Sequence, residues 1–296
     1  MQLTRGARPR VPAVVVSQGT QLLMCDVFGK PHLFRGLPQI DRRIVAWGAG
    51  AKAVELPHAA VLVSEEELVA RLQGEWHDSP DAAWTMYGSR PLPEGVEERH
   101  FGSRRAWAVA ADFEGSACWV ESLEGGWLFL IPGWLIAVGS MPEELLAESR
   151  LVAGQVGGLR GEAAAFPAYP RIADPLCGTG WLACGSAAMA FDPICGDGTG
   201  NAVREAILAS AVIRAASRGE AVEPLLAHYR ARLIAGFYRH LQLALEFYRR
   251  GNGGTWWQQE TAAMEQGATW CAGELARGPG FRYRLEGFEL RASTEF

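Results

Sequence analysis

The organisation of the chain is clearest when it is read outward from residues 180–201, GWLACGSAAMAFDPICGDGTGN. The apolar run 181–184 predicts a short strand, and a glycine-rich loop follows it. Apolar residues then return at helical spacing, which predicts a helix with Asn201 as its N-cap. In such a connection free amides and the positive end of the helix dipole face the loop, so the pattern favours binding of an electron-rich ligand.

These residues resemble the second flavin motif of the FAD-dependent hydroxylases and halogenases that share the p-hydroxybenzoate hydroxylase fold. In that family a strand ends in Gly-Asp, and small residues, an Asp-Pro or Pro-Pro pair, a glycine loop and a long helix follow. The positions that the resemblance implies to be cofactor-binding are Gly185, Ser186, Asp192, Pro193, Gly196, Gly198, Thr199 and Gly200. An ordinary strand–loop–helix connection without a ligand is the alternative that the residues leave open.

Two departures from the family pattern concern FAD itself. Ser186 replaces the aspartate that holds the ribityl chain, and a hydroxyl accepts hydrogen bonds more weakly than a carboxylate. The family's N-terminal βαβ unit with G-x-G-x-x-G, which binds the pyrophosphate, is not found in this sequence. We expect that the first strands were lost, or that the chain is a fragment or starts from a misplaced initiation site. FAD binding is therefore expected to be weakened or lost, by about ten- to a hundredfold per charge-assisted contact.

A series of strands is predicted over 106–113, 118–122, 126–131 and 135–139, at hairpin spacing, which indicates an antiparallel sheet. Within it the run GWLFLIP resembles the Gly-Trp-x-Trp-x-Ile-Pro strand of flavin-dependent halogenases. The resemblance implies a strand between flavin and substrate. Its implied substrate-side residues are Trp127, Phe129 and Pro132. The alternative is a core strand whose tryptophan simply packs.

The N-terminal part predicts a buried strand over 11–17 and a helix over 18–28. Residues 17–20, Ser-Gln-Gly-Thr, weakly resemble the Gly-Glu-Ala/Ser-Thr motif of the halogenase-like members. Residues 48–53 fit the dinucleotide fingerprint G-x-G-x-x-A, but Pro57 follows at once and no helical period begins. We interpret this stretch as the turn of a β-hairpin, with a further short strand at 60–63.

The remaining helices are indicated by caps and periodicity. Two capping boxes predict helices over 64–72 and 140–156. A proline at the first helical position predicts a long helix over 224–251, and a third helix is predicted over 256–275. The pair Trp256-Trp257 is expected to pack against the long helix, with a lid over the substrate as the alternative.

The fold class that follows is α/β, or mixed α+β. We expect a truncated FAD/NAD(P)-binding hydroxylase-like fold with an antiparallel substrate-side sheet and C-terminal helices. Residues 1–75 and 165–220 would form an interrupted flavin-binding core without the first βαβ unit. Residues 76–164 would form the antiparallel substrate domain, and residues 221–296 a helical region.

Composition narrows the class of protein. A charged fraction of 21% and a net charge of −5 are typical of a globular protein without an electrostatic field for nucleic acid. The most apolar stretch, 173–194, is interrupted by Asp174, glycines and prolines, so no membrane span is expected. The start lacks the apolar region of a signal peptide, and the six cysteines and six histidines show neither C-x-x-C pairs nor metal-ligand spacing. We therefore expect a cytoplasmic protein with reduced thiols and no metal.

The function implied by the resemblance is that of an FAD-dependent oxidoreductase, similar to monooxygenases and halogenases, acting on an unknown small molecule or peptide. No catalytic acid or base can be identified. Halogenases use a lysine to carry the activated halogen, and the only lysines are Lys30 and Lys52, so the sequence does not support halogenation. The alternative function is a non-catalytic relative that serves as scaffold or as protein partner of another enzyme.

Overall fold

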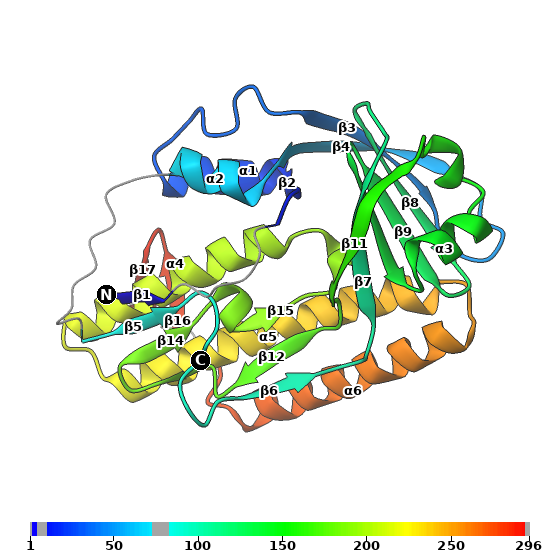
Figure 1. Cartoon of the computed structure of the whole chain (residues 1–296). Coiled ribbons are helices and arrows are strands. Elements are labelled where there is room, and N and C mark those ends of the chain that lie inside the picture. Colours follow the sequence, from blue (N-terminus) through cyan, green and yellow to red (C-terminus); the bar gives the residue numbers. More distant parts are fainter. Residues whose placement is uncertain (1, 5–10, 73–82, 294–296) are drawn as a thin grey trace.

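The computed structural model describes residues 2–4, 11–72 and 83–293. A large curved sheet forms the upper and right-hand part of the molecule in Figure 1, and three long helices and smaller sheets lie beneath it. These helices are α4 (Gly198–Ser217), α5 (Val222–Arg249) and α6 (Thr255–Arg277). The mixed α/β architecture predicted from the sequence is confirmed. Among the residues described, no helix is long and apolar enough to cross a membrane.

The large sheet has eight strands in the order β11-β7-β10-β9-β8-β3-β4-β2. Neighbouring strands are antiparallel except β3 and β8, which run parallel. The bounds are β2 Val14–Ser17, β3 Gln39–Ala46, β4 Val54–Val63, β7 Arg105–Ala111, β8 Ala117–Leu123, β9 Gly126–Ile131, β10 Trp134–Gly139 and β11 Leu159–Pro167. The predicted strand series over 106–139 is thus one sheet, with Trp127 on a strand. The edge strand β11 was not predicted, because its mostly exposed residues lack an apolar alternation.

The N-terminal elements follow the predicted order. Ser17 caps α1 (Gln18–Val27) by accepting from the Thr20 amide at 3.3 Å. The Ser64 hydroxyl accepts from the Glu67 amide at 3.0 Å and so caps α2 (Glu65–Leu72). Strands β3 and β4 pair as the predicted hairpin, but β4 is one continuous strand where two short ones were expected.

Helix α3 (Pro142–Glu148) ends eight residues before the predicted end of that helix at 156. The reason is the buried carboxylate of Glu121 on β8, which accepts from the amides of residues 150, 151 and 152 and from the Ser149 hydroxyl. These amides would otherwise continue the helix. Ser140 is not the cap either, since the N-cap position is Met141 and no side chain caps the helix.

The smaller sheets lie beside the long helices. A four-stranded sheet has the order β1-β5-β14-β13, with β5 parallel to both β1 and β14. A three-stranded sheet has the order β15-β12-β6, and β16 and β17 form a hairpin. The bounds are β1 Gln2–Thr4, β5 Thr85–Tyr87, β6 Glu97–His100, β12 Arg171–Asp174, β13 Cys177–Gly178, β14 Trp181–Ala183, β15 Met189–Ala190, β16 Tyr283–Glu286 and β17 Glu289–Ala292. The predicted strand before the glycine loop is therefore confirmed.

The domain boundaries expected from the sequence stay a prediction. Strands β5 and β6 belong by sequence to the segment 76–164, but they pair with β14 and β12 and not with the large sheet. Part of that segment, 76–82, lies outside the described residues.

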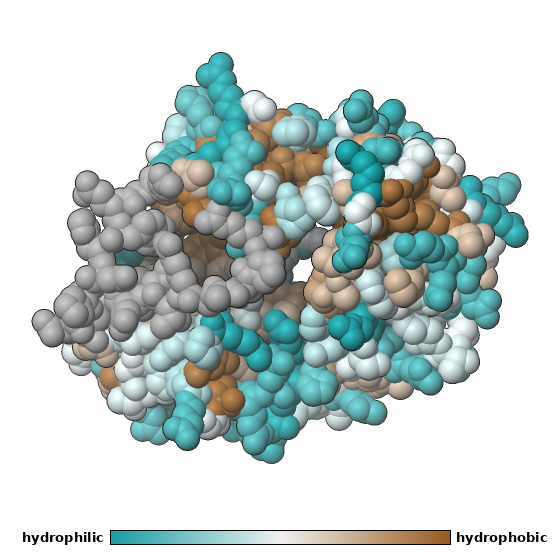
Figure 2. Space-filling view, viewed as in Figure 1, coloured by the Kyte–Doolittle hydropathy of each residue, from teal (hydrophilic) through white to brown (hydrophobic). Residues whose placement is uncertain are grey.

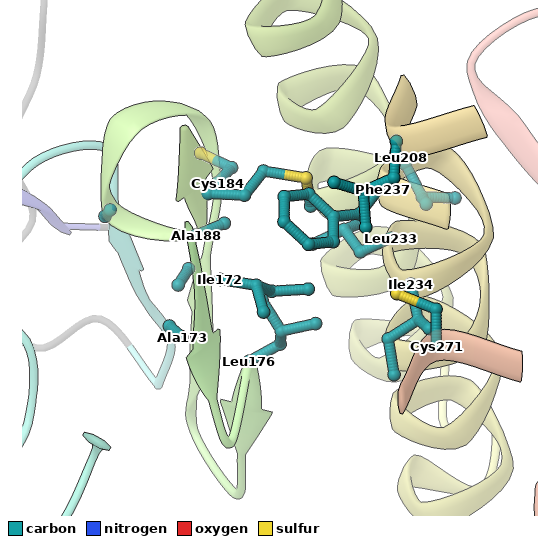
Figure 3. Packing of buried hydrophobic residues seen from close by; sticks show 14 of the residues in the cluster. Ile172, Ala173, Leu176, Cys184, Ala188, Leu208, Leu233, Ile234, Phe237 and Cys271 are labelled. Carbon is teal, nitrogen blue, oxygen red and sulfur yellow. The ribbon is translucent and has the colours of Figure 1, made fainter. Parts of the chain in front are cut away.

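The main core lies between the small sheets and helices α4 to α6. Figure 3 shows Ile172 and Leu176 pointing toward Leu233, Ile234 and Phe237 of α5 across this core. Helix α5 begins two residues before Pro224, at Val222. The amphipathic pattern of α5 and α6 was visible in the sequence because both helices bury one face.

Candidate functional site

Helix α4 begins earlier than predicted, at Gly198, and Asn201 lies inside its first turn. The Asn201 amide donates to the carbonyl of Asp197 at 2.9 Å, which is the first helical hydrogen bond. Asp197 holds the N-cap position, but its carboxylate does not cap the helix. One oxygen accepts from the Thr20 hydroxyl and the other from Arg204, each at 2.8 Å. The carboxylate is thus held away from the helix axis by α1 on one side and by the next turn of α4 on the other.

This arrangement leaves the first-turn amides of α4 without a side-chain cap. The amides at a helix start carry partial positive charge and favour an electron-rich ligand. Gly196, just before the helix, is left-handed with φ +61°. A Cβ on Gly198 would meet no atom of the described residues within 4 Å, whereas a Cβ on Gly200 would overlap the Asp197 carboxylate and the Thr20 hydroxyl. Gly198 therefore borders free space, whereas Gly200 is needed because Asp197 and Thr20 pack closely against it.

The turn after β14 holds the next predicted positions. Gly185 has φ +55°, and its amide donates to Oε2 of Glu205 on α4 at 2.7 Å. Burial raises the pKa of Glu205 from 4.5 to about 8, although the Gly185 amide acts in the opposite direction. Ser186 is exposed, and its hydroxyl donates to the Gly88 carbonyl at 3.2 Å. Glu205 was not singled out in the sequence, because a single glutamate in a helical pattern carries no signal of its burial.

Asp192 faces the core and not the free space. Its Oδ1 accepts from the Ile194 amide at 2.8 Å and so caps the short turn Pro193–Cys195. Its Oδ2 accepts from Nε of Arg104 at 2.7 Å and from the Tyr248 hydroxyl at 2.8 Å. Asp192 therefore anchors the loop that leads to α4, with Pro193 at the first position of the turn. Its expected contact with FAD stays a prediction.

Arg104 is the centre of a buried polar network behind this loop. Its side chain is 0% exposed and pairs with Glu260 of α6 as well as with Asp192. The guanidinium lies over the Tyr248 ring, 4.8 Å from its centroid. Burial lowers the pKa of His240 to about 4, so the neutral ring can accept from the Asp192 amide at 2.8 Å. The network joins the residue just before β7, together with α5 and α6, to the predicted flavin loop.

The predicted substrate-side residues occupy different environments. Trp127 is 2% exposed, and its indole donates to the Tyr248 hydroxyl at 3.3 Å, so it packs in the core. Phe129 and Pro132 are half-buried. The register places Phe129 opposite Val120 of β8, on the same face of the sheet as Cys118. Whether any of them contacts a substrate stays a prediction.

Arg43 was not predicted from the sequence, and it extends from β3 toward the loop before α4. In the register it lies opposite Cys118 and so shares the sheet face of Phe129. Its Nη2 is 4.0 Å from the place that a Cβ of Gly196 would occupy. Figure 2 shows an opening at the centre of the molecular face, where Figure 1 draws the start of α4 close to the end of β11.

No family model matches the chain, and no curated protein matches its sequence. Solved structures do share its fold, which is that of flavin-dependent halogenases and monooxygenases. One similar structure is the peptidyl tryptophan dihydroxylase QhpG, essential for tryptophylquinone cofactor biogenesis, at TM-score 0.71 and 18% identity over 99% of this chain and 79% of that one. The flavin-dependent halogenase CmlS aligns at TM-score 0.70 and 16% identity, over 90% of this chain and 65% of that one. The p-nitrophenol 4-monooxygenase PnpA from Pseudomonas putida DLL-E4 aligns at TM-score 0.61 and 14% identity, over 92% and 88%.

Proposed function

We propose that the chain is an FAD-dependent oxidoreductase, similar to monooxygenases, that binds the flavin ring at the start of α4. The observation that carries the proposal is the uncapped first turn of α4 beside the open space at Gly198, in a fold shared with flavin-dependent enzymes. In many helices an aspartate at the N-cap would satisfy these amides itself. Here Asp197 is held by Thr20 and Arg204 instead.

The residues present fit this cofactor. The amides of Gly198 and Thr199 would donate to the polar edge of the ring, and Gly198 provides room because it has no Cβ. The exposed Ser186 hydroxyl would bond the ribityl chain. When bound, FAD supplies the redox chemistry by which oxygen oxidises an organic substrate. The chain supplies position, through the Asp192 anchor of the loop, and an apolar wall, through the sheet face that carries Phe129.

The substrate class extends to small molecules and peptides, since the similar structures include enzymes for both p-nitrophenol and peptidyl tryptophan. We do not extend the proposal to halogenation. Lys30 donates to the carbonyl of Arg71 at 2.8 Å, and Lys52 is exposed in the β3–β4 turn.

The test is a titration of the purified chain with FAD, followed by quenching of flavin fluorescence, for wild type and Gly198→Val. We expect weak but saturable binding by the wild type, because Ser186 replaces the aspartate of the family pattern. The variant should lose at least about tenfold in affinity, because the new side chain fills the space beside the amides. Gly236→Val is the matched control, since Gly236 is also helical and has no atom within 4 Å of its Cβ position. It should bind FAD like the wild type.

Thermal melts of all three proteins separate folding from binding. Absence of saturable FAD binding by the folded wild type would contradict the proposal. Equal affinity of wild type and Gly198→Val would place the flavin elsewhere.

A further inference from the structure

Among the residues that the structure describes, Arg43 has no negative partner, unlike the other arginines near it. Its Nη2 lies 3.3 Å from Nε2 of His58, and its Nε is buried without a hydrogen-bond partner. Within the described part of the chain no carboxylate forms an ion pair with Arg43. Arg42, on the opposite face of the same strand, lies 3.9 Å from both Asp41 and Glu55, and the buried Arg104 pairs with two carboxylates.

The immediate neighbours of Arg43 do not supply the missing charge. Burial and the positive charge of Arg43 both lower the pKa of His58, so the imidazole is neutral at neutral pH. Burial raises the pKa of the Cys118 thiol, although the Arg43 guanidinium acts in the opposite direction. A partly buried cation without a counter-ion costs free energy, and an anionic ligand would remove that cost.

The surroundings define what kind of anion fits. Arg43 shares its sheet face with Cys118 and Phe129, and this face carries a buried apolar cluster that includes Ile131. On the other side Arg43 approaches Gly196, at the turn before α4. A ligand here would lie between an apolar sheet and the start of α4. The planar guanidinium matches the two oxygens of a carboxylate.

We propose that Arg43, supported by His58, binds the carboxylate of an apolar organic substrate between the sheet and the Gly196 turn. The inference deepens the proposed function, because it assigns a substrate class to the same site. Arg43 is then a specificity-determining residue: it selects an organic acid and orients it against the face that carries Phe129. His58 keeps the guanidinium in place without neutralising it.

The experiment compares two probes of equal shape, 3-phenylpropionate and 3-phenylpropionamide, by NMR titration of the purified full chain at pH 7. We expect the carboxylate to bind the wild type about tenfold more tightly than the amide, as a charge-assisted hydrogen bond implies. Arg43→Gln should remove this preference, and Arg43→Lys should retain part of it. Arg42→Gln is the matched control, because it removes the same charge from the other face of β3 and should keep the preference.

Equal binding of both probes by the wild type would overturn the inference, whether or not the variants fold. A preference that persists in folded Arg43→Gln would overturn it as well. Repeating the titration with saturating FAD tests whether Arg43 binds the substrate or the cofactor. The preference for the carboxylate should remain. Its loss would mean that Arg43 binds FAD, and would refute the substrate role. If FAD does not bind but the Arg43-dependent preference is present, the proposed flavin function fails and the carboxylate site stands.

Discussion

At the scale of the residue, burial changes the acid–base properties of Glu205 in a way that the neighbouring sequence does not indicate. Glu205 of α4 is 8% exposed, and its carboxyl group accepts from the Gly185 amide at 2.7 Å. Burial gives it a folded-state pKa of about 8, against an ordinary value of 4.5. It therefore stays protonated at neutral pH in the folded chain while it ionises in the unfolded one.

This raised pKa predicts the pH dependence of stability. Below pH 4.5 the group is protonated in both states and costs nothing. Between pH 4.5 and about 8 only the unfolded chain releases the proton, so the free energy of unfolding falls as pH rises, by on the order of a few kcal/mol. Glu205→Gln should remove this fall and gain stability relative to wild type toward pH 8. Urea denaturation from pH 5 to 8 measures it.

Glu246→Gln, at an exposed position of α5, is the control and should follow the wild-type curve. If the Glu205→Gln and wild-type curves stay parallel across this range, Glu205 does not titrate as its burial implies.

At the scale of elements, the sequence predicted those strands and helices that depend only on local residue patterns. The hairpin strands 106–139, helices α5 and α6, and the strand before the glycine loop follow from periodicity and caps. The end of α3 and the start of α4, which the sequence misplaced, depend on distant residues. Glu121 ends α3 from β8, and Thr20 of α1 holds Asp197 at the start of α4.

In the candidate site, too, local motifs were predictable and contacts between distant segments were not. The glycine loop was recognisable as a contiguous motif. Its anchor could not be recognised, because Arg104, Asp192 and Glu260 meet only through the fold of three separate segments. Arg43 was not predicted because β3 gives no local sign that this arginine, unlike Arg42, faces inward.

The start of α4 yields a prediction that separates its two glycines. Gly200→Ala should lower the free energy of unfolding by about 1–3 kcal/mol, because the new Cβ overlaps the Asp197 carboxylate and the Thr20 hydroxyl. Gly198→Ala should be neutral or stabilising by about 0.5–1 kcal/mol, since its Cβ meets nothing and the unfolded chain loses freedom. Urea titrations followed by far-UV circular dichroism measure both. Equal losses in the two variants would mean that Asp197 and Thr20 do not constrain the helix start.

At the scale of the whole molecule, an aromatic cluster joins the sheet to the helices. Trp47, after β3, lies edge-on to Trp127 of β9 and Trp257 of α6, with ring centroids 6.2 and 5.5 Å away. Trp257 also packs on Tyr248 of α5, and its indole donates to the Leu123 carbonyl at 2.8 Å. The expected packing of the tryptophan pair against α5 is confirmed. Because the cluster spans both layers, we expect them to unfold together.

Trp257→Ala tests this connection. The side chain is 1% exposed, so its removal leaves a large cavity and removes the hydrogen bond to the Leu123 carbonyl. We expect a loss of about 3–5 kcal/mol in the free energy of unfolding. Far-UV circular dichroism should report the same midpoint as tryptophan fluorescence, because sheet and helices lose their shared core in one step. Trp256→Ala is the matched control: Trp256 is half-buried, and its removal should cost clearly less. Separate midpoints in the parent chain, or an equal loss in both variants, would show that the two layers are stabilised independently and that the cluster does not join them.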